Sequence, residues 1–141
     1  MINVHAVGRL TKNVDLRYSR ENNRAVANFY LACKKRSKDD RTTFIKCVAF
    51  DKAAEILEKY TCKGVMLEIM GELTEEEYVD SNGISKKYMQ IIVDKFEILE
   101  SKEMIQKRRE ENRNKNVDYS QINVYDQSPF EGMSDFGYFE S

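Results

Sequence analysis

The most constraining feature of this sequence is an alternation of apolar and polar side chains that recurs between residues 1 and 99. The alternating runs are 2–6, 25–33, 44–50, 65–73 and a last run that ends near residue 99. Because successive side chains of an extended strand point to opposite faces, a period of two predicts strands with one buried face. The chain is therefore predicted to be mainly β.

One helix is predicted between the third and the fourth of these strands. Residues 51–63 are rich in helix formers, with Asp51 as a candidate N-cap and Gly64 where helices commonly end. Ile56, Leu57 and other apolar residues recur at helical spacing and predict one buried stripe.

Five strands with one helix between the third and the fourth predict an all-β fold, a small five-stranded Greek-key barrel of the OB type. In such a barrel, closure of the sheet hides the strand edges. Gly8 and Gly71 stand inside strand patterns, which suits the bends and bulges that a barrel needs. A fragment of a β-sandwich is the alternative.

Charge divides the chain into three parts. Residues 1–100 carry 17 basic and 16 acidic side chains, residues 101–116 carry 6 and 3, and residues 117–141 carry 5 acidic and no basic ones. We expect a folded domain, then a charged linker because no apolar stripe supports a helix there, and then a disordered acidic tail. The six aromatic residues of the tail are unusual for a disordered segment and predict a partner-binding tip.

The composition narrows the classes of function. A net charge of −1 excludes a uniformly basic surface for a polyanion, so any such site must be local. No run approaches the roughly 20 apolar residues of a membrane span, and the first ten residues lack the apolar stretch of a signal peptide. We therefore expect no membrane association.

Cysteine and histidine usage excludes further classes. Cys33, Cys47 and Cys62 stand far apart, with only His5 as a possible imidazole partner, so neither a disulfide framework nor a metal site is predicted. One histidine and no recognisable catalytic motif also argue against an enzyme. We expect a cytoplasmic protein without metal or cofactor.

Aromatic and basic side chains share a face of the third predicted strand. Phe44, Lys46 and Phe50 lie on that face, and Tyr78 ends the fourth strand. An exposed aromatic ring can stack a nucleobase for roughly 1–3 kcal/mol per base without reading the sequence, while nearby cations hold phosphates. The alternative is that Phe44 and Phe50 are core residues.

Cations also gather in the loop between the second and third strands, where residues 34–41 carry five cations and two anions. A groove lined by cations would bind a polyanion with strong salt dependence, whereas a solvated hairpin tip is the alternative. The candidate groove residues are Lys34, Lys35, Arg36, Lys46, Lys86 and Lys87.

Several motifs, in order and with matching spacing, resemble one family. They are Gly8 to Lys12, Asp15 to Tyr18, Ala25 to Ala32, Phe44 to Glu55, Lys63-Gly64 leading to Gly71-Glu72-Leu73, and Tyr78 to Gly83. Over about residues 1–99 the sequence resembles the bacterial single-stranded DNA-binding protein family. The resemblance implies an OB barrel, a homotetramer, and a flexible linker with an acidic tip that recruits replication, recombination and repair proteins.

The resemblance also implies roles for particular residues. It implies that bases stack on Phe44, Phe50 and Tyr78. Phosphate or sugar contacts are implied near Arg9, Arg17, Tyr18, Lys34 and Lys46.

Some positions depart from the family pattern. Ser37 stands where the family often has an aromatic, and His5 replaces an aliphatic residue, where we expect a surface histidine without a special role. Three carboxylates, Glu75 to Glu77, precede Tyr78 where the family is usually basic, and should weaken binding or redirect the DNA strand.

The tail also departs from the family, because its Pro-Phe pair is internal. We expect either Pro129-Phe130 or Tyr138-Phe139 to anchor a partner.

These residues together predict a non-enzymatic OB-fold protein that binds single-stranded DNA with little sequence preference, protects it and recruits partners through its tail. The alternative is an OB-fold protein-interaction module with weak or no DNA binding, which the triple glutamate favours and the basic loop disfavours. A nuclease is the third class, disfavoured because a metal constellation is missing.

Overall fold

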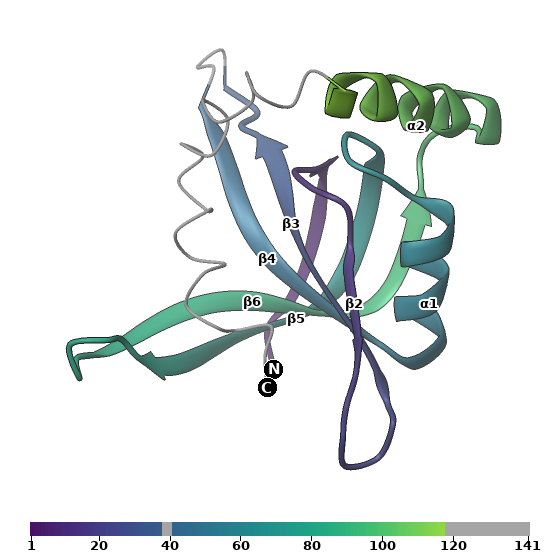
Figure 1. Ribbon diagram of the computed structural model, residues 1–141. Coiled ribbons are helices and arrows are strands. Elements are labelled where there is room, and N and C mark those ends of the chain that lie inside the picture. Colours follow the sequence, from purple (N-terminus) through teal and green to yellow (C-terminus); the bar gives the residue numbers. More distant parts are fainter. Residues whose placement is uncertain (38–40, 118–141) are drawn as a thin grey trace.

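The structure, a computed structural model, describes residues 1–37 and 41–117. This part of the chain contains six strands and two helices (Figure 1). The strands are β1 (Asn3–Leu10), β2 (Asp15–Tyr18), β3 (Ala25–Lys34), β4 (Thr42–Phe50), β5 (Met66–Val79) and β6 (Ser85–Ile98). The helices are α1 (Asp51–Tyr60), which follows β4 directly, and α2 (Lys102–Val117).

The strands form one sheet in the order β1-β5-β6-β4-β3-β2. The sheet curves back on itself because β1 pairs with β3 as well as with β5, so that Arg9 lies opposite both Ala32 and Met66. The pairing of β4 with β6 is parallel and the other pairings are antiparallel. A mainly β structure with this order is consistent with the OB-like fold expected from the sequence.

The sequence predicted five strands, and β2 is the additional one. Its four residues pair with the first half of β3, from Asp15 opposite Asn28 to Tyr18 opposite Ala25. Leu16 is the only aliphatic side chain in this strand, so the strand is too short and too polar to show a period of two. Its pairing with β3, rather than its own pattern, makes it a strand.

The hydrophobic core fills the inner face of the curved sheet. Its largest fully buried side chains are Leu31, Leu57, Leu67, Ile69, Val65 and Cys47. Helix α1 covers one side of the sheet and contributes Ala54 and Leu57 to this core. The described helices include none that is long and apolar enough to span a membrane.

Two glycines allow the close backbone approaches that curve the sheet. A β-bulge interrupts the β5–β6 register between Met70 and Gly71, and a Cβ at Gly71 would lie 2.0 Å from the carbonyl oxygen of Ile92. A Cβ at Gly8, where β1 passes from β5 to β3, would lie 2.6 Å from the carbonyl oxygen of Ala32. Side chains are excluded at both positions, and the bulge at Gly71 is of the kind that the sequence predicted for these glycines.

The ends of α1 differ from the sequence prediction. Phe50 is the N-cap residue, without a side-chain capping bond, and Asp51 has a positive φ of 57° instead of capping the helix. The helix ends at Tyr60, and Thr61 is extended, so Gly64 lies in the following turn rather than at the helix C-terminus.

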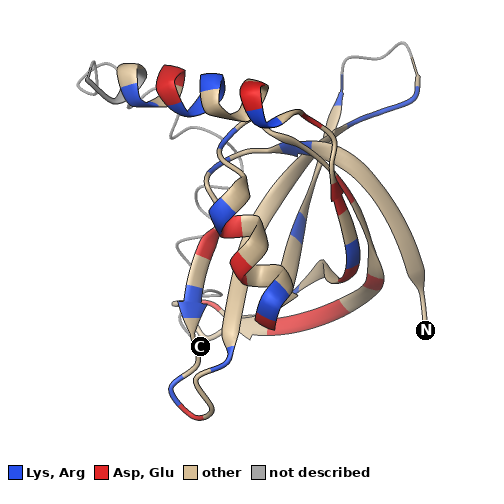
Figure 2. Cartoon of the chain, turned by 90° about the vertical axis from the view of Figure 1, so that its right-hand side faces the viewer, with Lys and Arg blue, Asp and Glu red and all other residues tan. Residues whose placement is uncertain are grey.

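The segment expected to be a charged linker forms helix α2 over Lys102–Val117. Figure 2 shows basic and acidic residues interspersed along it, and its sequence has no apolar stripe. One apolar side chain, Ile105, is buried against the core. Polar contacts also attach the helix to the domain: Arg109 donates to the carbonyl oxygens of Lys59 and Thr61, and Asn112 donates to that of Lys63. Helical periodicity could not predict a helix that is held in this way.

Glu100 links α2 to the sheet. Its carboxylate accepts hydrogen bonds from Arg108 at 2.7 Å, from Arg9 at 2.7 Å and from the Met66 amide at 3.0 Å. Burial alone would raise the pKa of Glu100, but the hydrogen bonds from Arg108, Met66 and Arg9 lower it below its ordinary value. The carboxylate is thus kept charged between two guanidinium groups.

Candidate nucleic-acid interface

The two faces of β4 have different roles. Ile45, Cys47 and Ala49 belong to the core or pack against it. Phe44 and Phe50 are half-buried and lie outside the core cluster, on the opposite face. The structure therefore disfavours the interpretation of these two rings as core residues.

The neighbouring strands complete this opposite face. Lys46 lies between Tyr30 of β3 and Gln90 of β6 in the register, and Phe44 lies opposite Ala32. Continuing across the sheet, Gln90 lies opposite Thr74 of β5, and Tyr88 lies opposite Glu76. We call this surface the outer sheet face, which comprises Tyr30, Phe44, Lys46, Phe50, Thr74, Glu76, Tyr78, Tyr88 and Gln90.

Lys46 is the central cation of the outer sheet face. It is 4% exposed, and its Nζ lies 4.8 Å from the centroid of the Tyr88 ring. Burial lowers the pKa of Lys46 to about 8, although the nearby carboxylate of Glu76 acts in the opposite direction. Near neutral pH this side chain is a cation in an environment that favours its neutral form.

Three tyrosines lie close together on this face: Tyr30 and Tyr88 adjoin Lys46, and Tyr78 adjoins Tyr88. The rings of Tyr78 and Tyr88 lie 5.8 Å apart at 55°, and Tyr30 is almost fully buried beside Lys46. Burial raises the pKa of Tyr30 and that of Tyr88, so both phenols stay neutral. The sequence pattern indicated Tyr78 but not Tyr30 or Tyr88, although each of these is a tyrosine at an outward position of a strand.

The three consecutive glutamates separate onto two faces. Glu76 lies on the outer sheet face, where its carboxylate accepts hydrogen bonds from Thr74 at 3.3 Å and Gln90 at 3.4 Å. Glu75 and Glu77 are exposed and alternate away from it. The outer sheet face thus holds one of these carboxylates rather than three.

The predicted cations of the β5–β6 hairpin have acidic neighbours. Lys86 Nζ lies 3.5 Å from an Asp80 oxygen, and Lys87 Nζ lies 3.8 Å from a Glu77 oxygen. The hairpin extends well beyond the rest of the sheet (Figure 1). Local acidic partners thus offset much of its positive charge.

The predicted cations of β1 and β2 are also paired. Arg9 donates to Gly64 O and to Glu100, which places it in the attachment of α2. Arg17 contacts Asp15 at 3.3 Å, and Tyr18 is half-exposed beside it on β2. Arg9 thus helps to hold α2, and its side chain is about half exposed, as are those of Arg17 and Tyr18.

Further predicted cations lie at the end of β3 and in the loop that follows it. Lys34 lies two residues from Ala32, on the same face of β3, and is exposed. Lys35, Arg36 and Ser37 are exposed as well, and residues 38–40 lie outside the described part. The predicted tail anchors, Pro129, Phe130, Tyr138 and Phe139, also lie outside it.

His5 lies at the edge of the sheet on β1. Its Nε2 is 2.9 Å from a carboxylate oxygen of Glu68 on β5, and its side chain is half-exposed. This is the surface position expected for it.

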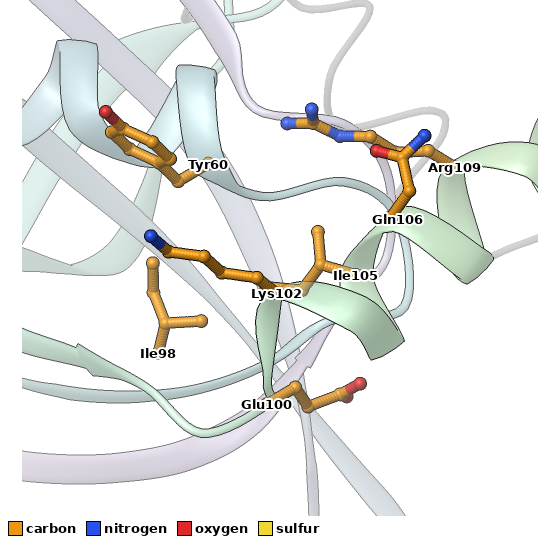
Figure 3. Close-up of a pocket in the computed structure, with 7 residues that line it drawn as sticks. All are labelled: Tyr60, Ile98, Glu100, Lys102, Ile105, Gln106 and Arg109. Carbon is orange, nitrogen blue, oxygen red and sulfur yellow. The ribbon is translucent and has the colours of Figure 1, made fainter.

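A cleft of about 390 Å³ lies between α1, α2 and the end of β6, away from the β5–β6 hairpin (Figures 1 and 3). Tyr60, Ile98 and Ile105 form its apolar part, and Lys102 and Arg109 lie at its polar side. The residues that line this cleft include none of the predicted DNA-binding residues, so it is separate from the outer sheet face.

Comparison with known proteins assigns the family. The sequence profile of the Single-strand binding protein family matches residues 1–99. The chain belongs to this family. This confirms the resemblance that the sequence motifs indicated.

Three relatives show how far the similarity extends. The single-stranded DNA-binding protein of Clostridium perfringens is 34% identical over 101 residues, which cover 72% of this chain and 67% of the relative. That of Enterococcus faecalis is 34% identical over 110 residues, covering 75% and 58%. Single-stranded DNA-binding protein 3 of Streptococcus agalactiae is 31% identical over 128 residues, covering 88% and 92%. The matched region thus spans between 58% and 92% of the length of these relatives.

The lowered pKa of Lys46 predicts how stability depends on pH. An unfolded lysine titrates near its ordinary pKa of 10.5 and the folded one near 8, so between these values the unfolded chain binds more protons. Stability attributable to Lys46 therefore rises as pH increases through this window, because the cost of burying the charge is relieved. Compared with Lys46→Met, the wild type should gain up to about 3 kcal/mol of unfolding free energy between pH 7 and pH 10.5.

Urea unfolding of both proteins across this pH range measures the difference. Lys52→Met, at an exposed position of α1, is the matched control and should follow the wild type at every pH. An unfolding free energy of Lys46→Met that parallels the wild type would show that Lys46 titrates as an exposed lysine.

Proposed function

We propose that this chain binds single-stranded DNA with little sequence preference and protects it during replication, recombination and repair. The observation that carries the proposal is the outer sheet face, where Lys46 lies over the Tyr88 ring, Tyr78 lies beside Tyr88, and Phe44 lies two residues from Lys46 on β4. Every nucleobase has a π-face, so rings on such a surface bind bases of any sequence. Membership in the family supports the same function.

In this proposal, two sets of cations make most of the contacts to phosphates. Lys34, Lys35 and Arg36 are exposed at one end of the outer sheet face, and Lys46 lies at its centre. A chain with a net charge of −1 binds a polyanion only where cations are concentrated in this way. Arg17 and Tyr18 on β2 are further candidates for contacts to the DNA backbone.

A protein-interaction module is the second candidate, and Glu76 favours it. This carboxylate lies on the outer sheet face beside Lys46 and repels phosphate there. A titration with fluorescent oligo(dT) at two salt concentrations separates the two functions. Strong binding that weakens as the salt concentration rises supports DNA binding, and no binding supports the interaction module.

Self-association is part of the proposal, with a homotetramer as the expected state. Strand β1 pairs with β5 from Asn3 to Arg9 but with β3 only at Arg9 and Leu10, so within the described residues its second edge lacks a strand partner from Asn3 to Gly8. An open edge of this kind is a template for pairing with a second copy. Light scattering should give about four times the chain mass of 16.6 kDa, and a monomer mass would contradict this.

We also propose that residues 117–141 recruit replication, recombination or repair proteins. This segment has five carboxylates, six aromatic side chains and no cation, which suits a basic pocket with an apolar centre. In a binding assay with such a protein, either Phe130→Ala or Phe139→Ala in a peptide of this segment should abolish most of the affinity. If both peptides bind like the unmodified one, the segment acts through charge alone.

The stacking assignment predicts the effect of removing rings. Phe44→Ala, Phe50→Ala and Tyr78→Ala should each weaken oligo(dT) binding by roughly 1–3 kcal/mol, because each removes the surface on which a base stacks. Fluorescence anisotropy of labelled oligo(dT) measures the affinity, and circular dichroism checks the fold. Tyr60→Ala is the control, since this half-exposed ring lines the α1–α2 cleft instead. Normal binding by all three variants would show that the outer sheet face does not stack bases.

A further inference from the structure

One predicted stacking ring, Phe50, is already covered on one side. The guanidinium carbon of Arg24 lies over this ring, 4.4 Å from its centroid. Arg24 directly precedes β3, and Val26 lies opposite Phe50 in the β3–β4 register, so the two side chains meet across neighbouring strands. A base that approaches this side of Phe50 therefore meets the guanidinium group first.

Asp51 holds the guanidinium group in this position. Arg24 Nε lies 3.0 Å and 3.2 Å from the two carboxylate oxygens of Asp51, and Nη2 lies 3.1 Å from one of them. Asp51 has a φ of 57°, in the left-handed region that aspartate tolerates better than most residues. This backbone conformation accompanies a carboxylate that binds Arg24 instead of capping α1. The hydrogen bonds to Asp51 raise the pKa of Arg24, which stays charged.

Space remains beside the covered ring. About half of the Arg24 side chain is exposed. Arg24 and Asp51 also line an open cleft of about 570 Å³ whose other walls include Asn22, Lys52 and Glu55. A planar group can thus reach Arg24 from solvent.

We propose that Arg24, held by Asp51 over Phe50, is a DNA-contact residue whose guanidinium group forms the outer layer of the stack on which a nucleobase packs. A guanidinium group is planar and stacks on aromatic faces, including those of bases. This inference rests on the proposed binding of single-stranded DNA. It adds to that function a residue that no sequence motif indicated.

Because Arg24 is paired with Asp51, the salt dependence of binding can distinguish a stacking role of Arg24 from a phosphate contact. A cation that neutralises a phosphate releases a counterion and adds about 0.7 to the slope of log affinity against log salt for single strands. Arg24 already has a carboxylate partner, so its contribution to affinity should depend little on salt. Asp51→Asn removes that carboxylate, and the freed guanidinium should steepen the slope.

The test uses the full chain and fluorescent oligo(dT) at four salt concentrations. Arg24→Ala should weaken binding at least about fivefold, the effect of 1 kcal/mol at 25 °C, with an unchanged salt slope. Arg24→Lys keeps the charge but loses the planar group, and should weaken binding almost as much. Combined with Phe50→Ala, Arg24→Ala should cause little further loss, because the two side chains act as one stack.

Arg20→Ala is the matched control. Arg20 is exposed in the turn that precedes Arg24, and its removal changes the net charge by the same amount. This variant should keep an affinity within about twofold of the wild type. Circular dichroism and thermal melts of all variants check that the fold is retained.

Three results would overturn the inference. Arg24→Lys binding like the wild type, with a shallower salt slope in Arg24→Ala, would make Arg24 a phosphate contact. Tighter binding by Arg24→Ala would show that Arg24 shields Phe50 from DNA. Unchanged binding by the Arg24 variants, while Phe44→Ala weakens it, would refute this inference alone, whereas a wild type that does not bind oligo(dT) would refute the proposed function.

Discussion

The alternation of side chains along β4 is the constraint on which the rest of the molecule depends. This strand lies between β3 and β6, so its backbone is paired on both sides and its side chains can point only to the two faces. Cys47 and Ala49 on one face close the core with α1, and Phe44 and Lys46 on the other form the centre of the outer sheet face. A shift of the register by one residue would bury Lys46 in the core and expose Cys47, so the fold and the candidate site share one register.

Charge on the outer sheet face is arranged locally. Lys46 is almost fully buried beneath the Tyr88 ring, and this burial disfavours its charged form. The nearby carboxylate of Glu76 favours the charged form. A bound phosphate would favour that form more strongly, because its charge would approach a group that is shielded from water. Glu76 thus has two opposing effects. Without DNA, it helps to keep Lys46 protonated, but it also repels a phosphate that would take its place as the anionic neighbour of Lys46.

The periodicity of the sequence predicted most strands and the faces of their side chains. It could not predict features that depend on contacts between segments distant in the sequence. The alternation located five of the six strands and placed Phe44, Lys46 and Phe50 on one face, but it could not show that Tyr30 and Tyr88 join them through the register. Helix α2 was missed because Glu100 and backbone carbonyls, rather than an apolar stripe, hold it. Asp51 has the residue type of an N-cap, but Arg24, 27 residues earlier, binds its carboxylate instead.

Two features of the site act against unrestricted binding of a polyanion. Asp51 neutralises Arg24, and acidic neighbours offset Lys86, Lys87 and Arg17. Surface pairs of this kind contribute little to stability, so their main effect is on the field that a phosphate meets. With these four cations paired, the rings and the exposed loop at Lys34–Arg36 must supply a larger share of the affinity than in a uniformly basic groove. Stacking is insensitive to salt, whereas phosphate contacts are not, so this distribution favours binding that depends less on ionic strength than the number of basic residues would suggest.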